Sequence, residues 1–215
     1  MGDTASADDL YVYTSEYGLF GQESARQTLT DTSGIDTLNL ATIEDDLVID
    51  LTPGAVNSLV GNPFTVAAGT VIEKAYGGDG DDTFTGNAAD NYLYGMRGDD
   101  DLSGAGGNDT VDGGMGYDIA TYSGSIGDFS ITLHPDDSVT IEDLVGSEGL
   151  DTLIDIEMIQ FADDVYFVGD PIAPPINTAK APIVLPTITH TGTAFGSEYV
   201  QGDTVDNVLA TGGGN

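Results

Sequence analysis

The stretch from Gly77 to Thr121 reads GGDGDDTFT, GNAADNYLY, GMRGDDDLS, GAGGNDTVD and GGMGYDIAT when it is written nine residues at a time. Every unit begins with glycine, and the fourth position is glycine or alanine. The sixth position holds Asp82, Asn91, Asp100, Asp109 and Asp118, and the eighth holds Phe84, Leu93, Leu102, Val111 and Ala120. Because Gly and Asp are common turn residues, one copy would mean little, but five copies in unbroken phase indicate a repeat structure. We call this stretch the nonapeptide array.

The spacing within the array predicts a parallel β-roll. Glycines at positions one and four allow positive φ, so the first six residues can make a tight reversal that a Cβ would obstruct. The last three residues then form a short strand whose apolar side chain at position eight points inward. Two units make one flattened coil, and units two apart stack directly on each other. We therefore expect an all-β fold: a parallel β-roll with a core array at 68–121, irregular N-terminal coils and an antiparallel β cap.

The turns of such a roll suit calcium. Stacked strands lie about 4.8 Å apart, roughly twice the calcium–oxygen distance of about 2.4 Å, so an ion between two coils can take oxygens from both. The ligands would be the side chains at position six and the carbonyls that the glycine turns expose. The in-phase block Ala68–Tyr76 lacks the glycines but adds Glu73 at position six. The predicted ligand residues are Glu73, Gly77, Asp79, Asp82, Gly86, Asn91, Gly95, Arg97, Asp100, Gly104, Gly106, Asp109, Gly113 and Asp118.

Residues at position six, eighteen positions apart, form the pairs Glu73/Asn91, Asp82/Asp100, Asn91/Asp109 and Asp100/Asp118. These pairs predict several calcium ions, about four. Asn91 is neutral and Ala89 replaces a turn glycine, so sites that use the second unit are expected to be weaker. Tyr117 at position five is also atypical. The alternative interpretation is a solvated Gly/Asp-rich loop without metal, which the regular phase and the recurring apolar residue disfavour.

The chain as a whole is strongly acidic. It has 215 residues, with 37 acidic residues against 4 basic ones and a formal net charge of −33. Such a charge resists collapse through self-repulsion, but the acids cluster in the turns and leave the strand positions apolar. We therefore expect little structure without calcium and cooperative folding once the ion neutralises the turns. Arg26, Lys74, Arg97 and Lys180 form no basic patch, which excludes nucleic acid as a partner.

Other features of the sequence bear on its compartment. There is no cysteine, so disulfides cannot form, but this does not by itself identify a compartment. No apolar run has the length of a membrane span. The amino terminus lacks the positively charged region and apolar core of a signal peptide. An acidic, cysteine-free and calcium-dependent chain is expected outside a bacterial cell, where calcium is plentiful.

Segments on both sides of the array carry fragments of the same pattern. Before it, Leu10–Tyr13 and Leu47–Leu51 are expected strands, and Ser33–Leu40 repeats the G-x-D-x-U-x half-motif one residue out of phase. After it, short strands are expected to cover the open edge of the roll, and Gly149–Leu153 carries the half-motif once more. These strands are expected at 119–122, 128–133, 138–142, 152–156, 158–161 and 165–168. We interpret both flanks as caps, which a solenoid needs at its ends.

Beyond the second cap the composition changes. Five of the eight prolines lie between Pro171 and Pro186, which predicts a stiff, extended linker at 169–190. Residues 191–215 restart the nine-residue phase, with Glu198 and Asn207 at position six, and stop within a third unit. We therefore expect a β-roll domain with its caps at 1–168, then the linker, then the truncated start of a second array. On this interpretation the chain is part of a larger polypeptide.

The chain resembles the repeats-in-toxin (RTX) family, and within it the C-terminal domain of serralysin-type secreted metalloproteases. Asp31–Gly54, Gly69–Gly78 and Gly86–Asn91 are similar to the run that leads into the serralysin roll, and Asp151–Val165 is similar to the cap that often follows RTX arrays. The resemblance covers roughly residues 31–168. It implies calcium-dependent folding and export by a type I secretion system, in which the chain crosses unfolded and folds outside.

The chain departs from serralysins in its catalytic chemistry. A serralysin needs a zinc site of the H-E-x-x-H-x-x-G-x-x-H kind, whereas this chain has only His134 and His190, neither followed by the required glutamate. There is no cysteine nucleophile and no G-x-S-x-G elbow, and the paired carboxylates are better explained as calcium ligands than as glycosidase acids. We therefore expect a non-catalytic calcium-binding module that drives folding and secretion of a larger exported protein.

Two alternatives remain open. The first is a module that binds or orients a carbohydrate or polysaccharide for a secreted enzyme or adhesin, since exposed Tyr11, Tyr92 and Tyr94 could stack on sugars. Aromatic residues in strands are, however, more often packing residues. The second is an enzyme in its own right, for which the sequence offers no recognisable constellation of catalytic residues.

Overall fold

The computed structural model describes residues 8–17, 27–31 and 33–169. The chain divides into two units, Met1–Lys180 and Ala181–Asn215, and all the described residues belong to the first. The second array lies outside the described residues, as does the linker apart from Gly169. Both remain predictions.

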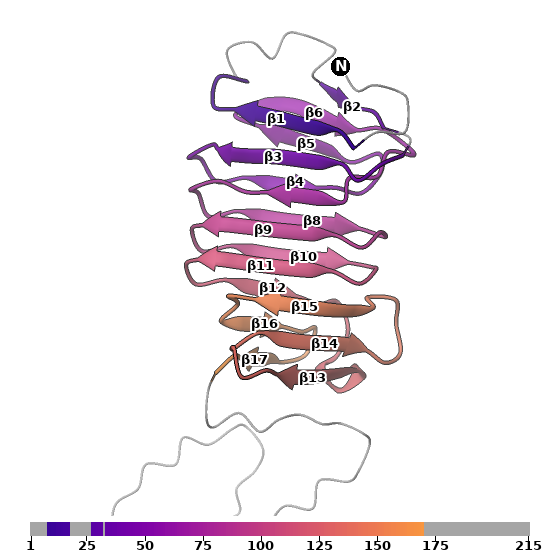
Figure 1. The fold of residues 1–215 in the computed structure, drawn as a ribbon, viewed down its shortest axis with the longest axis vertical. Helices are drawn as coiled ribbons and strands as arrows, with labels where there is room; N and C mark the ends of the chain where they lie inside the picture. The colour runs from indigo at the N-terminus through magenta and orange to yellow at the C-terminus, as the bar shows by residue number, and fades with distance from the viewer. Residues whose placement is uncertain (1–7, 18–26, 32, 170–215) are drawn as a thin grey trace, which may run out of the picture. The chain divides into compact units, whose positions relative to one another are not determined.

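The described residues form strands, with a short 3₁₀ turn, η2, at Ile126–Asp128. The strands are β1 (Leu10–Thr14), β2 (Thr28–Leu29), β3 (Thr37–Thr42), β4 (Val48–Asp50), β5 (Val56–Leu59), β6 (Asn62–Val66), β7 (Lys74–Tyr76), β8 (Thr83–Asn87), β9 (Tyr92–Arg97), β10 (Asp101–Ala105), β11 (Thr110–Met115), β12 (Ile119–Thr121), β13 (Phe129–Leu133), β14 (Val139–Asp143), β15 (Leu150–Ile154), β16 (Met158–Gln160) and β17 (Val165–Phe167). They make two sheets, in the orders β1-β3-β7-β9-β11-β15-β14-β13 and β17-β16-β12-β10-β8-β4-β5-β6-β2. Successive units of the array alternate between the sheets, so β8 lies behind β9 and β10 behind β11 (Figure 1).

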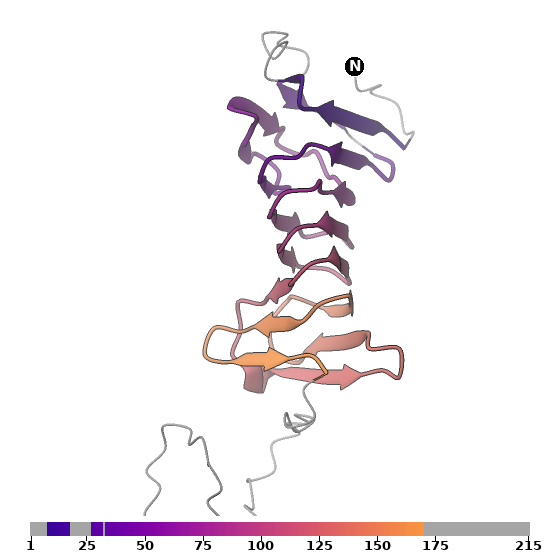
Figure 2. The same cartoon turned by 90° about the vertical axis from the view of Figure 1, so that its left-hand side faces the viewer.

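Units two apart stack directly on each other, as Figure 2 shows from the side. In the first sheet, Tyr92 lies opposite Lys74 on one side and Thr110 on the other, in parallel pairing. In the second sheet, Asp101 lies opposite Thr83 and Ile119 in the same way. Each partner is eighteen residues away, which is two nonapeptides. The prediction of an all-β parallel roll is confirmed.

The apolar residues at position eight form the core between the sheets. Phe84, Leu93, Leu102, Val111 and Ala120 are each at most 1% exposed, whereas their neighbours at positions seven and nine are half-buried, or exposed in the case of Asp101. This alternation follows from the period of two in a strand. Burial of each large apolar side chain stabilises the fold by about 1.5–3 kcal/mol, so one residue per unit carries most of the apolar contribution.

Left-handed backbone occurs at positions two and four of the last three units, not at one and four as expected. In the third unit, Met96 has φ 81° and Gly98 has φ 115°. The glycine at position one is needed for a different reason: a Cβ on Gly77 would lie 2.5 Å from both the Asp82 Oδ2 atom and the Gly95 carbonyl oxygen. The expectation for position one is therefore corrected, because close approach of neighbouring atoms, rather than φ, excludes a side chain there.

The N-terminal coils are irregular but continue both sheets. β1 pairs in parallel with β3, and β3 with β7, so the half-motif before β3 adds coils to the roll. The strands β4, β5 and β6 form an antiparallel meander whose first strand also pairs in parallel with β8. The strand expected at Leu47–Leu51 is observed as Val48–Asp50. This meander and β2 cover the first coil of the array.

The C-terminal cap is mixed rather than purely antiparallel. β15 pairs in parallel with β11, and β16 pairs in parallel with β12. The hairpin β13–β14 then pairs antiparallel with β15, and β17 pairs antiparallel with β16. The strand expected at 152–156 lies at Leu150–Ile154. The cap therefore begins with one more parallel coil, and the antiparallel strands lie beyond it.

Candidate metal centre

The side chains at position six lie between stacked turns and bond to the backbone of the preceding coil. The Asp82 N–H donates to Asp100 Oδ1 at 2.7 Å, and the Asp100 N–H donates to Asp118 Oδ1 at 2.9 Å. On the other edge of the roll, the Asn91 N–H donates to Asp109 Oδ1 at 2.7 Å. The structure thus brings together three of the four predicted pairs, each through one carboxylate oxygen.

The second oxygen of these carboxylates is buried without a partner. The Oδ2 atoms of Asp100, Asp109 and Asp118 make no hydrogen bond, although the three residues are only 1%, 2% and 0% exposed. A buried carboxylate oxygen that loses water and gains no partner is costly. These turns therefore lack a positively charged group that would face the three oxygens.

The same burial raises the pKa values of these carboxyl groups. The pKa of Asp100 and of Asp109 rises to about 7 and that of Asp118 to about 6, chiefly because burial disfavours the charged form. For Asp100, the hydrogen bond from the Asp82 backbone opposes this rise, and the charges of Asp82 and Asp118 add to it. A divalent cation bound beside these carboxyl groups would lower their pKa values, since its charge favours the ionised form.

The glycines at position one let oxygens of neighbouring coils approach one another closely. A Cβ on Gly95 would collide with Asp100 Oδ2 and would lie 2.7 Å from the carbonyl oxygen of Gly113. Gly77 has the same surroundings, since Asp82 Oδ2 and the Gly95 carbonyl oxygen lie 2.5 Å from its Cβ position. One carboxylate oxygen and one carbonyl oxygen, from two coils, therefore converge beside each of these glycines. Calcium prefers such oxygen ligands, so the residues present fit this ion.

A second series of hydrogen bonds, which was not predicted from the sequence, runs along position five. The N–H of Asp99 donates to Asp81 Oδ1 at 2.9 Å, and that of Asn108 donates to Asp90 Oδ1 at 2.8 Å. The Tyr117 N–H donates to Asp99 Oδ1 at 2.8 Å and ends the series on its edge. The signal was an acidic or amide residue at position five of every unit but the last. These bonds hold the turns in register outside the position-six carboxylates.

The pair Glu73/Asn91 differs from the other three. Glu73 Oε2 accepts the N–H of Asp36 at 2.7 Å, toward the N-terminal coils. The Asn91 Nδ2 group donates to the carbonyls of Ile72 at 3.0 Å and Glu73 at 3.3 Å, while its Oδ1 accepts the Asn87 N–H at 2.7 Å. The amide therefore satisfies the oxygens around it without an ion, which a carboxylate could not do.

The remaining predicted residues lie in the same turns. The Cβ of a residue replacing Gly86 or Gly104 would collide with the side chain at position six of the same unit, and Gly106 lies in the turn that follows Gly104. The side chains of Arg97 and Asp79 form an ion pair at 3.5 Å, 65% and 47% exposed. Such an exposed pair contributes little, so any ligand role of these two residues would rest on their carbonyls.

The tyrosines proposed as sugar platforms are less exposed than expected. Tyr11, Tyr92 and Tyr94 are all half-buried. Tyr76 makes edge contacts with Tyr92 and Tyr94, with ring centroids 6.0 Å and 6.4 Å apart, and Tyr11 packs against the core. The expectation of exposed rings is therefore corrected: the strands pack these side chains against one another or against the interior.

Neither histidine suggests catalysis. His134 lies between β13 and β14, and its Nε2 atom is 2.6 Å from the Thr140 hydroxyl, a contact that ties the two strands of the hairpin. His190 lies outside the described residues. Among the residues that the structure describes, no helix is long and apolar enough to cross a bilayer.

Residues 76–111 and 85–120 match the profile of the RTX calcium-binding nonapeptide repeat (4 copies). The array consists of RTX calcium-binding repeats. The matched residues include the turns whose carboxylate oxygens are buried without partners, so the RTX array has both the sequence and the geometry of a calcium-binding repeat. No curated protein matches the chain. The match is to a repeat of typically non-catalytic character, and the finer resemblance to the serralysin C-terminal domain remains a prediction.

Proposed function

We propose that this chain is a non-catalytic module whose RTX array folds when calcium binds, and that it stabilises a larger exported protein. The single observation that carries the proposal is the set of buried, unpartnered carboxylate oxygens on Asp100, Asp109 and Asp118. Without a cation these turns combine desolvated acids with a chain of net charge −33. The ion therefore supplies the positive charge that would face the buried carboxylates, and its binding is linked to folding.

Linkage makes the folded population depend on calcium concentration. An unfolded chain does not hold the turns of adjacent coils together, so calcium binds the folded form far better and stabilises it by mass action. Each carboxylate at position six lies between two neighbouring coils, so the filling of one turn orders the next. Cooperative folding over a narrow calcium range is the expected result.

The proposal extends to export. An acidic chain that stays unfolded in calcium-poor cytosol could cross a type I secretion system and fold in calcium-rich surroundings outside the bacterial cell. The cysteine-free and strongly acidic composition supports this proposal. On the same grounds we propose that the roll with its caps is one part of a longer secreted polypeptide.

The deciding experiment combines far-UV circular dichroism with isothermal titration calorimetry on the calcium-depleted chain. The expected outcome is a disordered spectrum in chelator, a β-rich spectrum in millimolar calcium, and binding of several ions in the same concentration range. Magnesium at equal concentration serves as the control, since it demands an octahedral site with shorter bonds. A spectrum that is the same with and without calcium would refute calcium-induced folding.

A polysaccharide-binding role is a second candidate. The cluster of Tyr76, Tyr92 and Tyr94 on the outer face of the first sheet favours it, since three neighbouring rings offer apolar area with hydroxyls. Affinity electrophoresis in alginate and other polysaccharide gels would test it, with the calcium-loaded chain and a Tyr92→Ala, Tyr94→Ala double variant. Equal migration of both chains with and without polysaccharide would remove this candidate.

A further inference from the structure

The segment Gly146–Ile154 has the pattern of another nonapeptide. It reads GSEGLDTLI, with glycine at positions one and four, Asp151 at position six and Leu153 at position eight. The segment lies outside the matched repeats, from which the hairpin β13–β14 separates it. Leu153 is 1% exposed, like the residues at position eight within the RTX array.

The structure stacks this segment on the fourth unit of the RTX array as though no residues intervened. Thr152 lies opposite Thr110 in parallel pairing. The Asp109 N–H donates to Asp151 Oδ1 at 2.8 Å, which is the bond seen at position six in the array. The Leu150 N–H donates to Asn108 Oδ1 at 3.0 Å, which is the bond seen at position five. Both series of hydrogen bonds therefore continue into the cap.

The turn of the segment is also built like those of the array. Gly149 has φ 82°, and a Cβ there would collide with the Gly107 carbonyl oxygen, just as a Cβ on Gly116 would collide with that of Gly98. The glycine at position four thus allows the same close approach between coils. Substitution by any other residue would strain the backbone and push the coils apart.

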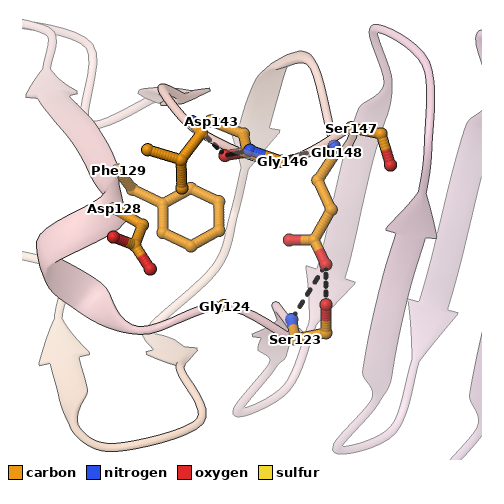
Figure 3. A pocket seen from close by; sticks show the side chains of 9 residues that line it. Ser123, Gly124, Asp128, Phe129, Asp143, Gly146, Ser147 and Glu148 are labelled. Atoms are coloured by element: carbon orange, nitrogen blue, oxygen red, sulfur yellow. Dashed lines mark hydrogen bonds between the residues drawn. The ribbon is translucent and has the colours of Figure 1, made fainter.

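Neighbouring acids hold this turn in place, as Figure 3 shows. Asp143 accepts the N–H of Gly146 at 2.7 Å and that of Glu148 at 2.9 Å. Glu148 Oε1 in turn accepts the N–H of Ser123 at 3.0 Å and contacts its hydroxyl. Asp143 and one oxygen of Glu148 therefore bond within the cap, and Glu148 Oε2 is buried without a hydrogen bond. Asp151 instead faces the RTX array.

The other edge of the roll is closed by the short turn Asp155–Glu157. Glu157 Oε2 accepts the Asp118 N–H at 2.7 Å, which is the bond of a residue at position six. A Cβ on Gly113 would lie 2.5 Å from Asp118 Oδ2 and would collide with the Asp155 carbonyl oxygen. This is the arrangement seen around Gly77 within the array. Asp155 has φ 47°, so its backbone is held in the left-handed region to present that carbonyl.

We propose that Gly146–Glu157 is a further calcium-binding coil, with Asp151 and Glu157 as ligands opposite Asp109 and Asp118. The independent observation is that Asp109 Oδ2 and Asp118 Oδ2 are buried without a hydrogen bond, and that Asp118 Oδ2 and the Asp155 carbonyl oxygen both border the Cβ position of Gly113. Two ions bound there would join the cap to the RTX array and make the folding of the cap depend on calcium. The inference rests on the proposed function, because it extends the same chemistry beyond the repeats.

The first test measures the number of bound calcium ions by equilibrium dialysis. Glu157→Gln and Asp151→Asn each keep an oxygen that can accept the facing N–H but remove the charge. The control is Glu142→Gln, which removes an exposed carboxylate from β14. We expect each of the first two variants to bind about one ion fewer than the wild type, and the control to bind the same number. Unchanged stoichiometry in both ligand variants would overturn the inference while leaving calcium binding by the array intact.

A second test uses terbium luminescence and leaves every carboxylate in place. The Tyr122 hydroxyl donates to Asp151 Oδ2 at 2.8 Å, so Tyr122 would sensitise terbium bound beside Asp151, and phenylalanine would not. We expect Tyr122→Phe to lower tyrosine-excited terbium luminescence of the wild-type chain, and Tyr166→Phe, which changes another buried ring, to leave it unchanged. Equal luminescence of all three chains would overturn the Asp151 site. No terbium or calcium binding in the wild type would instead refute the proposed function itself.

Discussion

The turns Gly86–Asn91 and Gly95–Asp100 occupy equivalent places in successive units, yet they meet different needs. In the first, the Asn91 amide donates to the carbonyls of Ile72 and Glu73, so its polar atoms are paired within the protein. In the second, Asp100 Oδ2 is buried and has no partner. The two turns share a glycine at position one, but left-handed backbone occurs only in the second, at Met96 and Gly98. The comparison shows that the Asn91 amide completes its turn from within the protein, whereas Asp100 leaves one oxygen for a cation.

The largest expected effect comes from adding a side chain at position one, where oxygens of two coils meet. In Gly95→Ala, the new Cβ would collide with Asp100 Oδ2 and approach the Gly113 carbonyl oxygen. We expect the calcium-loaded chain to lose about 3 kcal/mol or more of unfolding free energy, because backbone cannot move aside cheaply. The control is Gly127→Ala, where a Cβ would meet nothing within 4 Å. Urea denaturation in calcium measures the stability of both variants, and equal stabilities would mean that the turn does not require glycine at position one.

Exchange of the residues at position six tests the comparison directly. Asp100→Asn should make the calcium-free roll more stable, by about 1–3 kcal/mol, because a buried charge without a partner is removed. It should also weaken calcium binding at the spaces shared with Asp82 and Asp118. On the other edge, Asn91→Asp should make the calcium-free roll less stable and strengthen calcium binding, because it adds a carboxylate that needs the ion. Calorimetry measures calcium binding, and melts in chelator with a stabilising osmolyte, which populates the calcium-free fold, measure its stability; shifts of the same sign in the two variants would contradict the comparison.

Proton binding to the buried carboxylates should stabilise the folded chain in part, as calcium binding does. Burial raises the pKa of Asp100 and Asp109 from 3.8 to about 7 in the folded chain. The folded form therefore keeps protons that the unfolded form releases, so calcium-free stability is greatest in acid and falls as pH rises toward about 7. Calcium affinity should change in the opposite direction, since only ionised carboxylates bind the ion strongly. Far-UV circular dichroism of the calcium-depleted chain between about pH 5 and pH 8 measures its β content, which should be greater in acid; a greater β content at pH 8 would contradict this prediction.

The smallest effect is expected at the surface of the same turns. Arg97 and Asp79 pair at 3.5 Å with both side chains largely exposed, so Arg97→Ala should change the unfolding free energy by less than about 0.5 kcal/mol. The measurement is a urea titration in calcium at low and moderate salt. A loss similar to that of Gly95→Ala would mean that surface charge, rather than the buried oxygens, controls the turns.

The prediction of the roll succeeded where the signal is local and repeated. A constant spacing of nine residues places Leu93 and Val111 on one sheet and Phe84 and Leu102 on the other, and all four are buried as expected. The stacking of units two apart follows from the same period. The prediction was less complete at the ends, since β15 and β16 are parallel to the array although an antiparallel cap was expected.

The carboxylates contributed by the flanks could not be placed from spacing. Asp36 and Glu73 are 37 residues apart, Asp109 and Asp151 are 42 apart, and Asp118 and Glu157 are 39 apart, whereas pairs within the array are eighteen apart. The half-motifs around Asp36 and Asp151 could be seen, but not which coil each would join. The intervening meander and hairpin have variable lengths, so only their packing fixes the register.

The sequence by itself determined the coil, because glycine, aspartate and one apolar residue recur at positions where a turn, an ion and a core require them. Tertiary structure alone decided which oxygens are left without partners. Whether Asp100 Oδ2 or the Asn91 amide finds a hydrogen bond depends on the carbonyls of the adjacent coil, and those come from residues distant in sequence. For the same reason, the acids of the cap became candidate ligands only once the last coil was stacked on the array.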